Sequence, residues 1–225
     1  MTIDDLGAGI AYIKKNSAIR EVVVSGGDAL SNSDDRLNEI LTRLYEIEHL
    51  EIIRIGSRNL VTLPFRITDK LASILAKFQP LFFHTHFNHP KECTREALEA
   101  CARLVDRGIP INNHTVLLRG VNDSVEVMRE LNLKLLMMRI KPYYLYQCDQ
   151  VFGNSDFRTT IKKGLEIMQG LRGWSSGLAV PQYVVDTPGG GKVPLLPNYV
   201  RSMDETKAVL TNYRGNDYEY YFPPS

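Results

Sequence analysis

The sequence feature that most constrains the fold is a regular alternation of short apolar runs and helical patterns. Runs rich in β-branched or aromatic residues recur about every 30 residues, which is the length of one strand–helix unit. Several runs, such as the valines at 22–24, are apolar on both faces, as strands of a helix-covered parallel sheet must be. The pattern predicts an α/β fold, a partial (βα) barrel of parallel strands, with a doubly wound open sheet as the alternative.

The predicted elements follow one another without a long gap. Strands are expected at 22–24, 50–55, 81–87, 111–118, 143–148 and 179–185. Helices are expected at 3–15, 33–47 and 94–108, and others begin at Thr68, at Ser124 and near Thr159. One helix precedes the first of these strands, so a first barrel strand upstream of that helix would be missing from the chain.

The regular pattern stops after Lys192. The sequence KAVLTNYRGNDYEYYFPP, at 207–224, predicts a β-hairpin with its turn around Gly215 and Asn216. We therefore expect two parts: a partial barrel over residues 1–192 and a C-terminal β-extension over residues 193–225, packed on the barrel.

The composition argues against several classes of function. The 27 Lys and Arg residues balance 26 Asp and Glu residues, and the net charge of +1 argues against a nucleic-acid binder with a strongly basic surface. No apolar run reaches the length of a membrane span, and the first residues do not form a secretory signal, so we expect no membrane association. Three cysteines without framework spacing indicate reduced thiols in a cytoplasmic protein.

Polar residues gather at the predicted carboxyl ends of the strands, where an α/β barrel carries its chemistry. Gly26 and Gly27 precede Asp28, and two glycines let a backbone approach a ligand closely, although a tight turn needs them equally. His84 and His86 share one strand face. With no third ligand at a matching spacing, they favour hydrogen bonding to a polar ligand over binding a metal.

The segment DTPGGGK, at 186–192, is the most informative one. Three glycines before Lys192 predict a mobile loop that carries a single amine. The segment lacks the spacing of a phosphate-binding P-loop, so Lys192 is a candidate Schiff-base former, and an ordinary exposed loop is the alternative.

Six segments together resemble the lysine 2,3-aminomutases, radical S-adenosylmethionine (SAM) enzymes that also use pyridoxal phosphate. The segments are VVVSGGDAL, RIGSRNLVTLPFRIT, HTHFNHPKE, TVLLRGVNDS, PYYLYQCD and VVDTPGGGKVPLLPNYV, in the family's order. The resemblance implies a partial barrel and an isomerase that converts L-lysine into L-β-lysine by radical amino migration. It also implies a homo-oligomer.

The resemblance assigns roles to individual residues. Lys192 matches the lysine that forms a Schiff base with pyridoxal phosphate, and Asp149 and Asp186 match two carboxylates that hold the ε-ammonium of the substrate. The segment Gly26, Gly27 and Asp28 matches the motif that receives the amino group of SAM.

Two histidines complete the implied cofactor site. His86 stands where a histidine contacts SAM, and His114 stands where the family typically has glutamine, which alters that contact.

The chain also departs from the family in lacking its cluster-binding motif. The family's Cys-x-x-x-Cys-x-x-Cys motif, which binds a [4Fe–4S] cluster, is absent, and Cys93, Cys101 and Cys148 do not have its spacing. In the family this motif lies before the segment that matches residue 1, so the chain resembles the C-terminal portion of such an enzyme. The alternatives are a related radical SAM aminomutase with another substrate, and a non-catalytic remnant that binds pyridoxal phosphate.

Overall fold

A computed structural model describes residues 3–223. Seven strands form the larger sheet in the order β1-β2-β3-β4-β5-β6-β7. Neighbours from β1 to β6 are parallel, and β7 runs antiparallel to β6. The strands are β1 (Glu21–Val24), β2 (Ile52–Gly56), β3 (Leu81–Thr85), β4 (Ile111–Leu117), β5 (Ile140–Gln147), β6 (Gln182–Thr187) and β7 (Gly191–Pro194).

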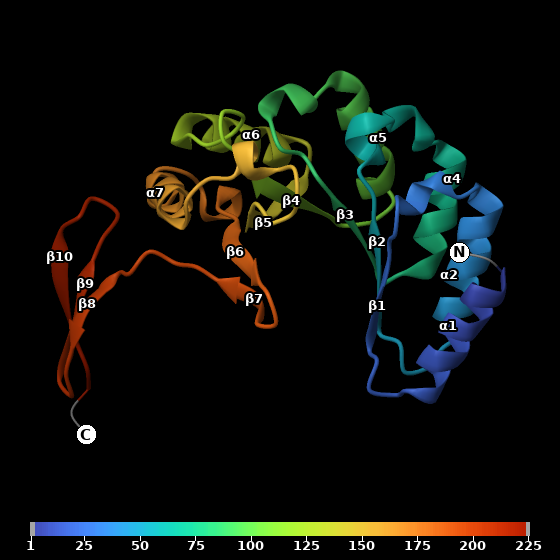
Figure 1. The fold of residues 1–225 in the computed structure, drawn as a ribbon, viewed down its shortest axis with the longest axis horizontal. Helices are drawn as coiled ribbons and strands as arrows, with labels where there is room; N and C mark the ends of the chain where they lie inside the picture. Colours follow the sequence, from blue (N-terminus) through green and yellow to red (C-terminus); the bar gives the residue numbers. More distant parts are fainter. Residues whose placement is uncertain (1–2, 224–225) are drawn as a thin grey trace.

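The sheet curves, and the main helices lie on its outer side (Figure 1). They are α1 (Ile3–Lys15), α2 (Asp34–Tyr45), α3 (Asn59–Thr62), α4 (Asp69–Leu75), α5 (Arg95–Val105), α6 (Val125–Met137) and α7 (Ile161–Leu171). A doubly wound sheet would carry helices on both faces, so the partial barrel is confirmed.

Helix starts are set locally by capping side chains. Ser33, Thr68, Thr94 and Ser124 each accept a hydrogen bond from a backbone N–H in the first helical turn, as their positions predict. The last helix begins slightly later than expected, because Thr160, rather than Thr159, is its cap.

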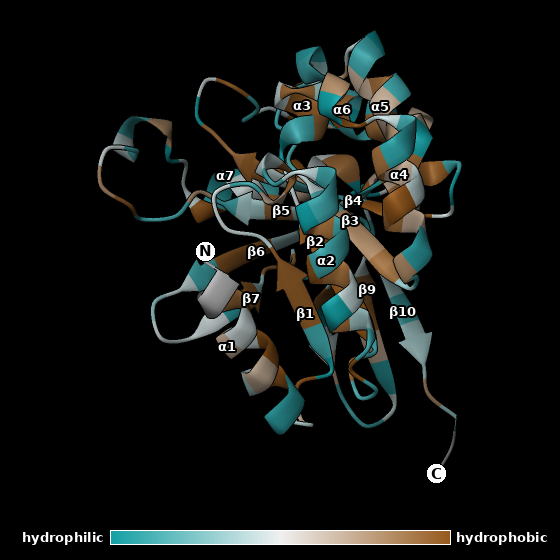
Figure 2. Ribbon diagram, turned by 90° about the vertical axis from the view of Figure 1, so that its right-hand side faces the viewer, coloured by the Kyte–Doolittle hydropathy of each residue, from teal (hydrophilic) through white to brown (hydrophobic). Residues whose placement is uncertain are grey.

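The core lies between the sheet and the helices. Outward residues of the strands, among them Ile55 and Phe83, are fully buried against helix residues such as Leu37 and Leu41. Figure 2 shows the apolar colour of β1, whose three valines match the predicted run. Burial of this outer face leaves the inner face of the curved sheet free to carry polar groups.

Strand β5 begins at Ile140 rather than at the predicted residue 143. Pro142 cannot donate a ladder hydrogen bond, which made the sequence resemble a strand starting after it. The register between β4 and β5 shifts beside Asn113 and His114, opposite this proline. This irregularity lets the strand continue past a residue that normally interrupts a sheet.

The C-terminal part forms a separate sheet in the order β10-β9-β8. Its strands are β8 (Val200–Met203), β9 (Lys207–Thr211) and β10 (Asp217–Tyr221). The β9–β10 hairpin confirms the prediction, and β8 adds a third strand. The sheet projects from the barrel as an arm, and Tyr213 packs edge-on against Trp174 beyond α7 (Figure 1).

The glycine segment differs from the sequence prediction. Residues 191–194 form strand β7, paired to β6 through a tight turn, and do not form a mobile loop. Thr187 stabilises the turn, because its hydroxyl donates to the Gly191 carbonyl at 3.0 Å. The glycines thus shape a hairpin, and Lys192 stands on a strand.

Candidate functional site

The turn after β1 leaves its backbone open. Gly26 and Gly27 have φ values of 89° and 54°, and no atom lies within 4 Å of the position that a Cβ would take at either residue. The left-handed backbone favours glycine here, and the empty space above it suits a ligand that contacts main-chain groups.

The carboxylate of Asp28 is engaged within the protein. It accepts hydrogen bonds from the Leu30 N–H at 2.9 Å, the Ser57 hydroxyl at 2.7 Å and the Arg58 N–H at 2.8 Å. These contacts tie the turn after β1 to the end of β2. The side chain of Asp28 therefore has a structural role, and the groups of this segment that remain available to a ligand are those of its main chain.

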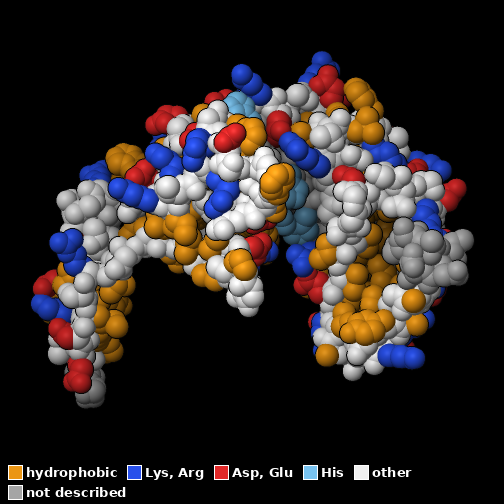
Figure 3. All heavy atoms as spheres, viewed as in Figure 1, with side chains coloured by type: hydrophobic (Ala, Val, Ile, Leu, Met, Phe, Trp, Pro, Cys, Tyr) orange, Lys and Arg blue, Asp and Glu red, His pale blue; other side chains and the backbone are white. Residues whose placement is uncertain are grey.

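Three histidines meet inside the curve of the sheet, where Figure 3 shows histidine atoms in the hollow of the molecule. His84 Nδ1 and His114 Nε2 are 2.9 Å apart, and the His86 ring lies edge-on to the His114 ring with centroids 5.3 Å apart. His84 and His86 therefore share a face, as predicted. Among residues 3–223, no three His, Cys, Asp or Glu side chains, these histidines included, are arranged so that they could hold a metal ion.

Burial keeps these histidines neutral. Desolvation, followed by nearby cations such as Arg54, lowers the pKa of His84 to about 4. Desolvation and the neighbouring histidines lower the pKa of His114 to about 3. The pKa of His86 is also lowered, chiefly by burial and then by Arg58. At neutral pH the cluster offers neutral donors and acceptors to a ligand.

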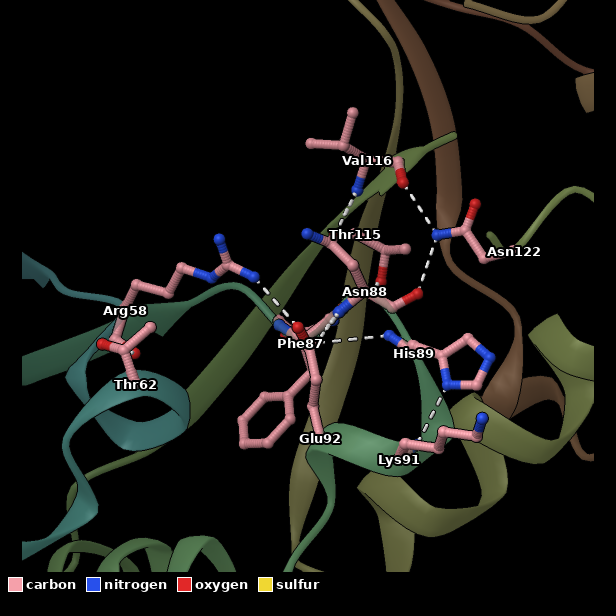
Figure 4. Close-up of polar contacts among 11 residues, drawn as sticks. Arg58, Thr62, Phe87, Asn88, His89, Lys91, Glu92, Thr115, Val116 and Asn122 are labelled. Carbon is pink, nitrogen blue, oxygen red and sulfur yellow. Dashed lines mark hydrogen bonds and ion pairs between the residues drawn. The ribbon is translucent and has the colours of Figure 1, made fainter. Parts of the chain in front are cut away.

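A hydrogen-bond network holds the loop that follows β3 and begins at His86, and Figure 4 shows its contacts around Asn88 and Glu92. Glu92 accepts from the Asn88 and His89 N–H groups and from Arg58, the last at 2.9 Å. The fully buried Asn122 donates to the Asn88 and Val116 carbonyls at 2.8 Å each.

Sequence reasoning missed Glu92 and Asn122 as parts of this support. The signal for Glu92 was its position three residues after His89, where it completes a capping box.

Lys192 points into the curve of the sheet. Its Nζ donates to the Tyr146 hydroxyl at 2.7 Å and lies 5.0 Å from the ring centre of Tyr144 and 4.9 Å from that of Tyr146. Tyr144 and Tyr146 alternate on β5, so they share a face with one another. The sequence showed this alternation, but the strand order that brings it near Lys192 was not visible.

Asp149 and Asp186 both line a cavity of about 640 Å³ at the ends of β5 and β6. Gln147 fixes its wall by donating to the Thr159 carbonyl at 2.8 Å and accepting from the Tyr183 hydroxyl at 2.6 Å. Arg158 also lines the cavity, and sequence reasoning did not single it out.

The three cysteines do not form a site. Each is a free thiol, and they lie on different elements: Cys93 before α5, Cys101 within α5 and Cys148 after β5. Burial raises the pKa of Cys93 to about 11 and that of Cys101 to about 12, so both remain protonated at neutral pH. Among residues 3–223, these cysteines belong to no group of side chains that could hold a metal ion.

Solved structures with the same architecture define the fold class. A radical SAM methyltransferase from Sphaerobacter thermophilus superposes with a TM-score of 0.58 and 19% identity, covering 80% of this chain and 55% of that one. An enzyme titled anSMEcpe with bound AdoMet superposes with a TM-score of 0.57 and 11% identity, covering 76% of this chain and 50% of that one. The chain therefore has the fold of radical SAM enzymes.

Sequence comparison narrows the class. The family model described as lysine-2,3-aminomutase matches residues 168–224. L-lysine 2,3-aminomutase of Fusobacterium nucleatum is 53% identical over 96% of this chain and 51% of its own length. Glutamate 2,3-aminomutase of Clostridioides difficile is 49% identical over 92% of this chain and 49% of its own length. The chain is a relative of the lysine 2,3-aminomutases, as predicted.

The alignment covers only part of the length of each relative. The chain spans about half the length of the curated relatives it matches. Within residues 3–223, no helix is long and apolar enough to cross a membrane.

Proposed function

We propose that this chain forms the amino-acid-binding and cofactor-binding part of a lysine 2,3-aminomutase, an isomerase that converts L-lysine into L-β-lysine. The observation that carries the proposal is that Asp149 and Asp186 line one cavity. Lys192 stands opposite Asp186 in the β6–β7 ladder. The sequence identity of 53% and 51% with two enzymes of this name supports the same function.

The charges around the cavity suit the ε-ammonium of lysine. Two carboxylates and the Arg158 guanidinium leave one net negative charge, which an ammonium group neutralises. A substrate with a side-chain carboxylate would add a third negative charge beside Asp149 and Asp186. The cavity therefore favours lysine over glutamate.

The open turn after β1 fits SAM. The amino group of SAM would contact the main chain at Gly26 and Gly27, where no atom fills the space above the glycines. The hydrogen bond between Ser57 and Asp28 holds this turn against the end of β2. His86 and His114 would offer neutral hydrogen-bonding groups to the same ligand. SAM supplies the radical chemistry of its class.

Lys192 fits pyridoxal phosphate. A lysine amine on a paired hairpin strand, reaching the tyrosines of β5, is placed to hold an aldehyde cofactor covalently. Pyridoxal phosphate, when bound, supplies the conjugated system that lets an amino group migrate. The chain's own part is to hold that cofactor at one point and to orient the substrate ammonium at the neighbouring carboxylates.

The [4Fe–4S] cluster does not fit the described residues, because the three cysteines stand on different segments and belong to no group that could hold a metal. We expect the 225-residue chain, reconstituted with iron and sulfide, to take up no cluster, as measured by iron and sulfide content and by electron paramagnetic resonance. Stoichiometric iron with formation of 5′-deoxyadenosine would contradict this expectation. The free thiols also favour a cytoplasmic protein, and the family resemblance favours a homo-oligomer.

Glutamate is the second candidate substrate, because a glutamate 2,3-aminomutase is nearly as similar in sequence as the lysine enzymes. Calorimetric titration of the chain with L-lysine and with L-glutamate separates the two. We expect binding of L-lysine and much weaker binding of L-glutamate. Preference for L-glutamate would replace the proposed substrate, and binding of neither would remove the cavity from substrate recognition.

A further inference from the structure

Lys192 stands directly across from Asp186 in the antiparallel β6–β7 ladder. Opposite residues of such a pair project to the same side, with Cβ atoms about 5 Å apart. An ammonium and a carboxylate placed in this way normally attract each other. Yet among residues 3–223 no ion pair joins Lys192 to Asp186.

The lysine side chain reaches across β6 instead. In the sheet β6 lies between β7 and β5, and the Lys192 amine ends at the Tyr146 hydroxyl of β5, 2.7 Å away. The ring centres of Tyr144 and Tyr146 lie 5.0 Å and 4.9 Å from the amine, within the range in which a cation is attracted to an aromatic ring. Tyr146 thus provides the contact that competes with Asp186 for this amine.

We propose that Tyr146 is a positioning residue that holds the Lys192 amine away from Asp186. This separation leaves the Asp186 carboxylate available to the ammonium of an amino-acid substrate and the Lys192 amine available to an aldehyde cofactor. Without it, the protein's own lysine would occupy the carboxylate that is meant for the substrate. The proposal rests on the roles proposed above for Lys192 and Asp186.

The groups around the amine make Asp186 the relevant anion. Tyr144 and Tyr146 approach from β5, His114 from β4 and His84 from β3, and Arg54 of β2 acts on the same two histidines. The histidines are neutral near pH 7, because their pKa values are lowered to about 3 and about 4. Arg54 pairs with Glu21 of β1.

Asp149 is the other carboxylate of the neighbouring cavity, and it lies beyond the end of β5 rather than in the ladder.

The experiment measures the reactivity of the Lys192 amine without any cofactor. Trace acetylation with acetic anhydride across a pH series, read on the Lys192 peptide by mass spectrometry, gives the titration midpoint of this amine. In Tyr146→Phe we expect the midpoint to rise by about half a pH unit, because pairing with Asp186 favours the charged amine. The double variant Tyr146→Phe/Asp186→Asn should lose this rise.

Tyr144→Phe is the matched control. It keeps the ring below the amine and removes a hydroxyl that bonds to Tyr143, not to Lys192, so the midpoint should not move.

An unchanged midpoint in Tyr146→Phe overturns the proposal, and so does a rise that persists in the double variant. Because acetylation needs neither pyridoxal phosphate nor lysine, these results are independent of whether Lys192 binds the cofactor.

Discussion

The two halves of the site use their polar residues differently. In the half built from β1 to β4, side chains such as Asp28 and Asn122 form hydrogen bonds to other groups of the protein. The backbone at Gly26 and Gly27 in this half faces open space. In the half built from β5 to β7, Asp149 and Asp186 line a cavity with their side chains.

This difference separates two ways of binding. The first half is a scaffold whose loops present main-chain groups together with the neutral His86 and His114, so its other side chains matter chiefly for stability. The second half presents charged side chains, so substitutions there should change binding while the fold persists. The predictions below test this division, beginning with the largest expected effect.

Replacement of Lys192 should have the largest effect. Lys192→Ala should abolish covalent labelling at this position by pyridoxal phosphate and borohydride, because no other amine stands on the β6–β7 hairpin. Peptide mapping by mass spectrometry measures the label. Lys162→Ala, on the exposed side of α7, should leave it intact. A label that forms on another lysine in place of Lys192 would refute the assignment.

Neutralising either carboxylate of the cavity should weaken lysine binding about tenfold to hundredfold, the value of one charge-assisted contact to an ammonium. Asp149→Asn and Asp186→Asn are compared with Asp156→Asn, which lies in the short helix η5 (Ser155–Phe157) outside the cavity lining. Titration calorimetry with L-lysine gives the dissociation constants. Equal affinity in both cavity variants would remove these residues from substrate binding.

On the scaffold side, Asp28→Ala should lower the free energy of unfolding by about 2 kcal/mol, because three donors lose their acceptor. Asp35→Ala, in the first turn of α2, should cost only a few tenths of a kcal/mol. Urea denaturation measures both values. If Asp28→Ala kept full stability while Asp149→Asn lost it, the division between scaffold and binding half would be reversed.

Acid should weaken the scaffold through its buried histidines. The pKa values of His84 and His114 are lowered from 6.5 to about 4 and about 3, so below pH 6.5 the unfolded chain takes up protons that the folded chain does not. Stability therefore falls as the pH drops from about 6.5 towards these values, by about 2 kcal/mol per histidine at pH 5.

His114→Gln should reduce this pH dependence, and His49→Gln, outside the cluster, should not. Denaturant unfolding at pH 7 and at pH 5 measures it, and a chain that gains stability at pH 5 through these residues would disprove the explanation.

Local signals were readable from the sequence, and contacts across strands were not. Ser33 and Thr68 were recognisable as helix caps, because a cap depends on residues within one turn. A shared role for Asp149 and Asp186 was suggested by the family resemblance alone, and the structure shows that both line one cavity. The contact between Lys192 and Tyr146 depends on the order β5-β6-β7 and on β7 being a strand, neither of which is encoded locally.

The turn of the hairpin that carries Lys192 fixes the register between β6 and β7. Gly189 and Gly191 have φ values of 72° and 68°, and a Cβ at Gly190 would lie 2.3 Å from the Thr187 hydroxyl, so the turn admits little variation. Successive strand residues face opposite sides. A slip of one residue between β6 and β7 would therefore turn the amine from the hollow towards the helices. The number of glycines in the turn, rather than their flexibility, therefore decides on which face of the sheet the Lys192 amine lies.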